Sequence, residues 1–224
     1  MDRTAVALEE LAWARVVADH ACSLGVIQRH PTKRIVSNHL GAVLADAALQ
    51  AGVRYDSVVR VRVERIHATF PEAATLPGLL QLLKVCTAGE ILSWTHHVKT
   101  TRFISLIQLL SLLDISTTSE LQHWLSKDEA RDALLTLHGV GPKTYDYLCC
   151  LVGIDSVAVD RHVRTFASEA GVYVREYARM RSVITKAADL LNVTRRDFDG
   201  WIWQTMSERA PQERQSTFEW RTTQ

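Results

Sequence analysis

The chain has 224 residues, of which 47% are hydrophobic and 23% are charged, and its formal net charge at pH 7 is +1. This length is enough to bury a sizeable core in one large domain or in two smaller lobes. This balanced charge excludes a protein that binds nucleic acid through an overall excess of positive charge, so any such binding must come from local clusters of Lys and Arg. Without a long apolar run or a secretory signal pattern, the sequence predicts a soluble, cytoplasmic protein.

Apolar residues recur at helical spacing along most of the chain. The segments with this spacing cover residues 3–24, 39–50, 55–70, 76–94, 97–114, 119–126, 128–136, 142–151, 174–191 and 194–208. Within the third segment, the alternating stretch VVRVRVERI is also compatible with a strand, but the helical surroundings and the lack of a partner strand favour a helix. A loop is expected from His30 to Asn38. The sequence therefore predicts an all-α protein.

Residues 134–165, LLTLHGVGPKTYDYLCCLVGIDSVAVDRHVRT, contain the clearest candidate site. Gly139 and Gly141 flank Val140 in a tight turn, and Pro142 is well suited to the first position of a helix. The first amides of such a helix have no intrahelical partners and form an anion site. An ordinary helix–helix turn is the alternative, while the lack of a strand-rich context argues against a dinucleotide-binding loop.

The downstream motif VAVDRHV places Asp160 and His162 at the start of another amphipathic helix, where a carboxylate can be aimed into a cleft. Asp160 is also a favoured residue for capping a helix N-terminus, and both roles are compatible. His162 is suited to orienting the loop, to contacting a phosphate or to packing against a helix.

Taken together, LHGVGPKT and VAVDRHV resemble the motifs of the helix-hairpin-helix (HhH-GPD) DNA glycosylases of the endonuclease III type. In that family a hairpin reading L-x-G-V-G-x-K-T is followed, one helix and one loop later, by V-D-x-H-V. The resemblance is clearest across residues 128–170, and it is traceable from 39 to 126 and from 172 to 208.

The resemblance implies an all-α, two-lobed fold with a central cleft. Residues 1–30 and 172–210 would form one lobe, and residues 31–171 would form the other. The second lobe would hold the helix-hairpin-helix at about 128–152, and residues 211–224 would form a polar tail.

The activity implied by the resemblance is base-excision repair by a DNA glycosylase with associated apurinic/apyrimidinic (AP) lyase activity. Lys143 would attack C1′ of the damaged nucleoside and form a Schiff base, after which β-elimination cuts the strand. The attack needs a neutral amine, which burial and nearby positive potential favour. Asp160 would stabilise the oxocarbenium-like sugar and assist proton movements. A solvated lysine at a helix start is the structural alternative for Lys143.

The hairpin would bind DNA without reading its sequence, because amides that bind phosphates carry no base information. The residues expected to contact DNA there and in the following helix are Gly139, Val140, Gly141, Lys143, Thr144 and His162. The backbone carbonyls of Leu135, Leu137 and Val140 would hold a monovalent cation, Na⁺ or K⁺, that bridges to the same phosphate. His138 occupies a position that relatives often give to proline.

Removing a base requires the nucleotide to leave the stack, so a side chain should fill the gap. Gln50 lies near the position of the family's wedge glutamine. The loop of Thr95, His96 and His97 lies where relatives place a second wedge, although capping of the next helix by this His pair is an equally good interpretation.

Four aromatic residues are candidates for stacking on an extruded base, although core packing suits most of them better: Tyr145, Tyr147, Trp201 and Trp203.

The four cysteines, Cys22, Cys86, Cys149 and Cys150, show no metal-ligand spacing, and Cys149 and Cys150 are expected to be buried thiols. Since no cysteine follows residue 171, the iron–sulfur cluster of many endonuclease III relatives is not expected, and no cofactor is required.

The expected partner is double-stranded DNA with a lesion or an abasic site, bound by a monomer that is nucleoid-associated if prokaryotic and has no membrane contact. Three alternatives remain: a glycosylase without lyase activity, a non-catalytic helix-hairpin-helix DNA-binding module, and a helical protein scaffold. The sequence does not identify the lesion.

Overall fold

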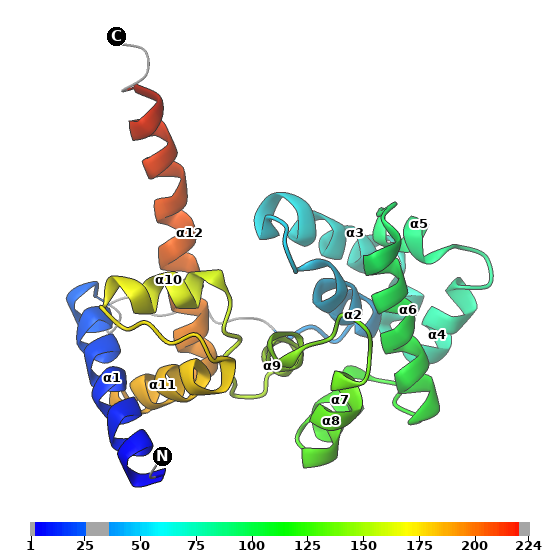
Figure 1. Ribbon diagram of the computed structural model, residues 1–224. Helices are drawn as coiled ribbons and strands as arrows, with labels where there is room; N and C mark the ends of the chain where they lie inside the picture. The colour runs from blue at the N-terminus through cyan, green and yellow to red at the C-terminus, as the bar shows by residue number, and fades with distance from the viewer. Residues whose placement is uncertain (1–2, 26–35, 220–224) are drawn as a thin grey trace. The chain divides into compact units, whose positions relative to one another are not determined.

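The computed structural model describes the backbone of residues 3–25 and 36–219 and the side chains of residues 4–25 and 36–209. All regular elements in this part of the chain are helices, which confirms the all-α prediction (Figure 1). None of the described helices is long and apolar enough to cross a membrane.

The chain forms two compact units, which we call the middle unit (residues 35–154) and the terminal unit (residues 1–34 and 155–224). The sequence-based division into two lobes places its second boundary after residue 171. Residues 155–171, which we expected in the middle lobe, belong to the terminal unit. The reason is that α10 (Arg161–Glu169) buries its apolar face in the core of the terminal unit.

The middle unit contains, in chain order, α2 (Leu40–Leu49), the π-helical turn η1 (Tyr55–Arg60), α3 (Val61–Thr69), the 3₁₀ turn η2 (Pro71–Ala74), α4 (Leu76–Leu82), α5 (Ala88–Leu92), α6 (His97–Leu112), α7 (Thr118–Leu125), α8 (Asp128–Leu135) and α9 (Pro142–Leu151). The alternating stretch VVRVRVERI is helical, so the strand alternative for it is wrong. The predicted segment 76–94 becomes two short helices, α4 and α5.

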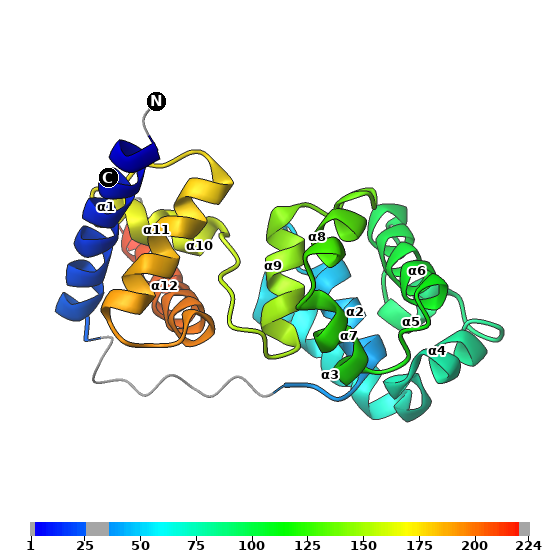
Figure 2. The same ribbon diagram turned by 90° about the horizontal axis from the view of Figure 1, so that it is seen from below.

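Helix α2 lies at the centre of the middle unit. All ten of its residues are buried, and it packs against α3, α6 and α9 (Figure 2). A helix that is apolar on every side is a buried helix, and the sequence LGAVLADAAL has that character, with Asp46 as its one charged residue. The C-terminal end of α2 therefore reaches the hairpin region from inside the core.

The short helices of the middle unit begin at well-defined caps. The hydroxyls of Thr87 and Thr117 each accept a hydrogen bond from the amide three residues on, and the carboxylates of Glu90 and Glu120 accept one from the cap amide. Such reciprocal capping satisfies two amides that would otherwise lack partners. These caps explain why the short helices α5 and α7 begin at Ala88 and Thr118.

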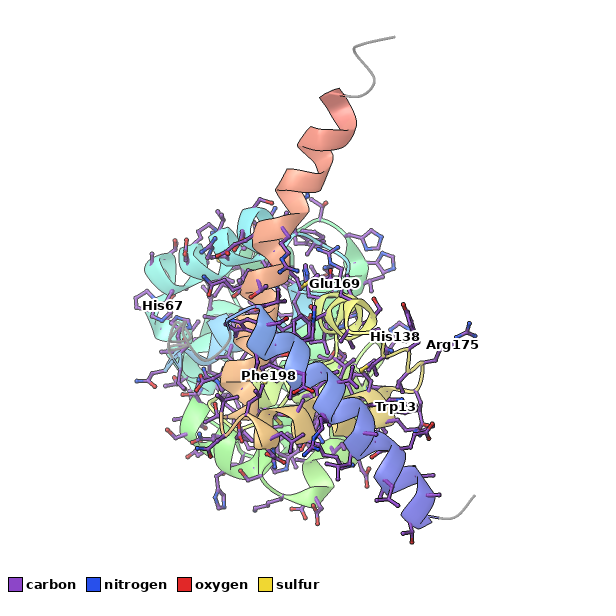
Figure 3. All side chains as sticks on the ribbon, turned by 90° about the vertical axis from the view of Figure 1, so that its left-hand side faces the viewer. Trp13, His67, His138, Glu169, Arg175 and Phe198 are labelled. Atoms are coloured by element: carbon purple, nitrogen blue, oxygen red, sulfur yellow. The ribbon has the colours of Figure 1, made fainter. Side chains whose placement is uncertain are left out.

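The terminal unit contains α1 (Arg3–Ser23), α10 (Arg161–Glu169), α11 (Tyr177–Leu190) and α12 (Arg195–Glu219). Three aromatic rings meet in its largely aliphatic core: Phe198 stacks on Trp201 with ring centroids 6.1 Å apart, and the edge of Phe166 meets Trp201 at 5.7 Å. Trp201 is 3% exposed. Trp13 of α1, labelled with Phe198 in Figure 3, also contacts α11: the guanidinium of Arg179 lies 4.9 Å from the centroid of the Trp13 ring.

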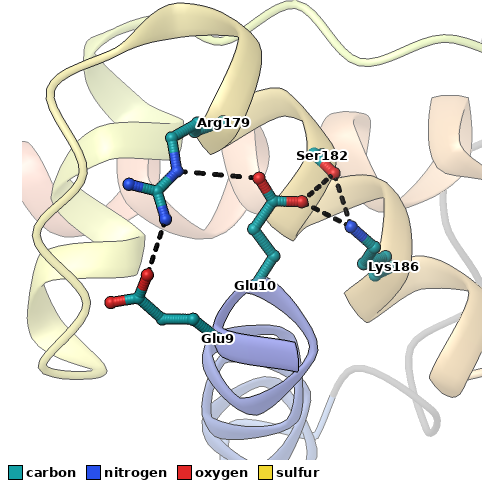
Figure 4. A network of polar contacts seen from close by, with 5 residues as sticks. All are labelled: Glu9, Glu10, Arg179, Ser182 and Lys186. Carbon is teal, nitrogen blue, oxygen red and sulfur yellow. Dashed lines mark hydrogen bonds and ion pairs between the residues drawn. The ribbon is translucent and has the colours of Figure 1, made fainter. Parts of the chain in front are cut away.

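A polar network joins α1 to α11 (Figure 4). The carboxylate of Glu10, 8% exposed, accepts a hydrogen bond from Ser182 at 2.7 Å and pairs with Lys186 at 2.5 Å. Arg179 lies between Glu9, at 2.8 Å, and Glu10, at 3.6 Å. Because the buried Glu10 is bonded to partly exposed partners on α11, this network fixes the register of the two helices.

Two predictions concern less regular parts of the chain. Of the predicted loop from His30 to Asn38, residues 30–35 lie outside the described residues, and residues 36–38 are non-helical as expected. Of the expected polar tail, residues 211 to 219 continue α12 as a helix, and the tail itself stays a prediction.

Candidate active site

The hairpin between α8 and α9 is built on Gly139, whose φ of +78° is a left-handed conformation that favours glycine. A Cβ atom at this position would come within 2.7 Å of Nη2 of Arg102. Gly141 differs: it has φ of −109°, caps α9, and a Cβ there would meet nothing within 4 Å. Gly139 is therefore required by the fold, whereas Gly141 leaves open space beside the helix start.

The backbone of the turn is partly engaged. The amide of Val140 donates to the carbonyl of Leu137 at 3.0 Å, while the amides of Gly139 and Gly141 make no backbone hydrogen bond within the described residues. Amides in this position, beside a helix N-terminus that begins with Pro142, are suited to an anion. The predicted cation site at the carbonyls of Leu135, Leu137 and Val140 stays a prediction.

Lys143, the second residue of α9, points toward the C-terminal end of α2. Its Nζ donates a hydrogen bond to Oε1 of Gln50 at 2.5 Å. Gln50 is the C-cap of α2, and its Nε2 is buried without a hydrogen-bond partner in the described part of the chain. The structure thus brings together two residues that the sequence singled out for different roles, nucleophile and wedge.

A second polar contact lies one helical turn away from this pair. Asp46 of α2 is 3% exposed and accepts hydrogen bonds from Tyr147 of α9 at 2.8 Å and from Tyr55 at 2.9 Å. Because Asp46 precedes Gln50 by four residues and Tyr147 follows Lys143 by four, each pair shares one helix face. The Asp46–Tyr147 contact therefore sets the register in which Lys143 meets Gln50.

Two further cations, both from α6, surround the same end of α2. Nζ of Lys99 donates to the carbonyls of Leu49 and Ala51, the latter at 2.7 Å. Nη1 of Arg102, a residue only 8% exposed, donates to the carbonyl of Ala48 at 3.0 Å.

Sequence reasoning identified the basic start of this helix but gave it no role. The available signal was the spacing of Lys99 and Arg102, which are three residues apart and lead into the buried face of α6 at Phe103 and Leu106. Asp46 offered a similar signal, as a lone carboxylate in an apolar helix.

Asp160 caps α10 in the terminal unit. Its Oδ1 accepts hydrogen bonds from the amides of His162 at 2.8 Å and Val163 at 3.0 Å. The N-cap interpretation of Asp160 is therefore confirmed. These bonds hold the carboxylate at the positive end of the helix, and Oδ2 accepts no bond from the described residues of this unit.

The ring of His162 meets the edge of Trp203 at a centroid distance of 6.3 Å. His162 thus contacts a helix of its own unit, in agreement with the packing interpretation. Lys143 lies in the middle unit and Asp160 and His162 in the terminal unit. The expected convergence of Lys143 and Asp160 on one sugar carbon stays a prediction.

The structure also places the His96–His97 pair and Thr144, for which the sequence suggested contacts with DNA. Nδ1 of His96 accepts from the amide of Val98 at 3.4 Å and caps α6, and the ring of the exposed His97 stacks on it with centroids 4.8 Å apart. Capping by this pair is therefore confirmed for His96. Thr144 is 5% exposed, so its side chain is buried, and its contact with DNA stays a prediction.

The candidate stacking aromatics are engaged within the fold. The hydroxyl of Tyr145 donates to the carbonyl of Leu125 at 3.2 Å, and Tyr147 is held by Asp46. Trp201 belongs to the core of the terminal unit, as the packing interpretation predicted, and Trp203 is only partly buried. Cys149 and Cys150 are buried thiols outside any disulfide, as expected.

Comparison with known proteins supports the fold. The model of a family described as "Domain of unknown function (DUF8548)" matches residues 15–207. No curated protein matches the chain. Among solved structures, the H. pylori 3-methyladenine DNA glycosylase (MagIII) bound to 1,N6-ethenoadenine aligns with a TM-score of 0.65 and 15% sequence identity, over 90% of this chain and 98% of that one. The chain thus has the helical fold of a DNA glycosylase, which confirms the predicted fold class.

Proposed function

Because this chain belongs to the DUF8548 family, whose description states no activity, its function must be inferred from its own residues, and we propose that it is a DNA glycosylase that excises a damaged or mismatched base from duplex DNA. The observation that carries the proposal is the placement of Lys143 directly after a glycine hairpin, with its amine held by Gln50. A fold shared with a glycosylase bound to 1,N6-ethenoadenine supports it.

We further propose that Lys143 is the nucleophile of a coupled AP lyase reaction. The lone pair of Nζ attacks C1′, the N-glycosidic bond breaks, and its electron pair leaves with the base, which takes up a proton. The sugar ring then opens: the C1′–O4′ bond breaks, O4′ takes up a proton, and the nitrogen lone pair forms the C1′=N bond of a Schiff base. Removal of a proton from C2′ expels the 3′ phosphate and cuts the strand.

In this reaction the hairpin binds the phosphate backbone and Asp160 offsets the positive charge that develops on the sugar. The open amides of Gly139 and Gly141 support the first role. A carboxylate fixed by two amides, with one oxygen left over, supports the second, because a preorganised charge needs no reorientation during the reaction.

Borohydride trapping tests the lyase proposal. Duplexes that each carry one lesion, including 3-methyladenine, 1,N6-ethenoadenine, oxidised pyrimidines, uracil mismatches and an abasic site, are incubated with the protein and reductant. The wild type is expected to form a covalent adduct that Lys143→Gln abolishes, and mass spectrometry of the released bases identifies the substrate.

The same panel separates the alternatives. Base release without trapping would remove the lyase step and leave a glycosylase in which Asp160 activates water. DNA binding without base release, indifferent to Asp160→Asn, would identify a non-catalytic DNA-binding module and refute the enzyme proposal.

A further inference from the structure

The last turn of α2 is held in place by two cations of α6. Lys99 binds the carbonyls of Leu49 and Ala51, and Arg102 binds that of Ala48. The last carbonyls of a helix lack intrahelical donors, and cations there also interact favourably with the helix dipole. Lys99 and Arg102 thus donate hydrogen bonds to backbone carbonyls that would otherwise lack a donor.

This clamped turn is the one that presents Gln50 to Lys143. Lys99 therefore binds the residues on either side of Gln50, while Lys143 binds the Gln50 side chain. Burial lowers the pKa of Lys99 to about 8, with further contributions from the charges of Arg102 and Lys143. Because Coulomb repulsion between two ammonium groups is mutual, the charge of Lys99 acts on Lys143 as well.

We infer that Lys99 is a positioning residue for Lys143: it fixes the turn that carries Gln50, and its positive charge disfavours the ammonium form of the Lys143 amine. The inference rests on the proposed function of Lys143 as nucleophile, since only a neutral amine attacks C1′.

Lys99 itself is poorly placed to be the nucleophile. Its Nζ is committed to two backbone carbonyls and lies 5.0 Å from the centroid of the Trp94 ring, in contact with the aromatic face. Attack by this amine would require breaking both carbonyl bonds and freeing the end of α2.

The other charged groups around the two amines come from each neighbouring element. Arg102 of α6 adds positive charge, and Arg62 of α3 lies on Trp94 at 5.2 Å. The carboxylate of Asp46 in α2 is bonded to Tyr55 and Tyr147.

The neighbouring elements carry further charged or titratable residues. The buried Asp146 of α9 adds a second carboxylate, and the charged residues of α8, Asp128, Glu129, Arg131 and Asp132, are exposed, as are His96 and His97 at the start of α6. Substituting Lys99 alone therefore measures the effect of its charge separately from these other groups.

The direct test follows the titration of each lysine side chain by NMR in ¹³C-labelled full-length protein. Lys99→Met is expected to raise the titration midpoint of Lys143 by about 0.5 to 1 pH unit, because a repelling charge is removed. Lys99→Arg keeps the charge and should leave that midpoint at the wild-type value. Lys143→Gln should raise the midpoint of Lys99 above about 8.

Unchanged midpoints in Lys99→Met and in Lys143→Gln would overturn the inference, and so would equal shifts in Lys99→Met and Lys99→Arg, which would indicate a purely structural role. Far-ultraviolet circular dichroism and urea unfolding verify that each variant is folded.

The pH profile of borohydride trapping on an abasic duplex then connects the titration to the reaction. Lys99→Met should shift the trapping profile to higher pH by the same amount as the Lys143 midpoint, and so reduce trapping at pH 7 by about 3- to 10-fold. Lys99→Arg should retain the trapping of the wild type. A wild type that never traps, with the NMR coupling intact, would refute the lyase proposal alone. A trapping wild type whose profile is unaffected by Lys99→Met would refute this inference alone.

Discussion

At the residue scale, the two glycines of the hairpin have different tasks. Gly139 adopts a left-handed conformation against the guanidinium of Arg102, whereas Gly141 has ordinary extended geometry and open space beside it. The G-x-G pattern in the sequence does not distinguish them. Their environments separate a glycine that the fold needs from one that leaves room for a ligand.

We predict that Gly139→Ala destabilises the protein by about 1–3 kcal/mol, because it combines backbone strain with a clash against Arg102. Gly141→Ala should cost only about 0.5 kcal/mol as a helix cap. It should nevertheless weaken binding to an abasic duplex by about tenfold, because a methyl group obstructs the approach of a phosphate to the amides. Urea unfolding and fluorescence anisotropy measure the two effects, and equal stability of the two variants would contradict the assignment.

Gln50 provides a second test at this scale. In Gln50→Glu a carboxylate faces Lys143 and favours its ammonium form, so trapping at pH 7 should fall about tenfold and recover as the pH rises. Gln50→Leu removes the acceptor without adding charge, and its trapping should fall without such a recovery. Coincident pH profiles for wild type and Gln50→Glu would show that the contact has no influence on the amine.

At the element scale, most helices are held by apolar faces, but the pair α1 and α11 also shares the buried carboxylate of Glu10. Burial raises the pKa of this carboxyl, yet the hydrogen bonds from Lys186 and Ser182 and the charges of Lys186 and Arg179 outweigh burial and lower the pKa below 4.5. A carboxylate with a lowered pKa stabilises the folded protein in its ionised form.

Glu10→Gln should therefore destabilise the protein by about 1–3 kcal/mol at neutral pH, because it weakens a buried charge-assisted network. The difference from wild type should be complete above the unfolded-state pKa of about 4.5 and should shrink as the pH falls through the lower folded-state value. Chemical unfolding at a series of pH values measures it. Glu9→Gln is the matched control, since Glu9 is more exposed and should matter little.

At the scale of the whole molecule, a net charge of +1 leaves no general attraction to DNA, so binding must come from local groups. The hairpin offers backbone amides, which contact phosphates and read no bases. This combination predicts weak selectivity for flanking sequence together with a dependence on salt.

We expect abasic duplexes of unrelated flanking sequence to bind with affinities within about 3-fold of one another, because phosphate contacts carry no sequence information. Affinity should fall between 50 and 200 mM salt as counterions are released, with a log–log slope of about −2 to −4 for a few phosphate contacts. Salt-independent binding, or none, would instead favour a helical protein scaffold.

Periodicity along the sequence was enough to determine the all-α class and most helix positions, since apolar spacing and caps are local properties. The motifs LHGVGPKT and VAVDRHV also located the hairpin, Lys143 and Asp160 as candidates. The N-cap role of Asp160 followed in the same way, because a cap and its helix are adjacent in the chain.

Only the tertiary structure decided which residues surround Lys143. Gln50, Lys99 and Arg102 come from helices far from it in the sequence, and they meet because α2 is buried between α6 and α9. The side of α6 that turns inward depends on packing against other helices, which a single sequence does not encode locally. For the same reason α10 joined the terminal unit, where its apolar face finds a core.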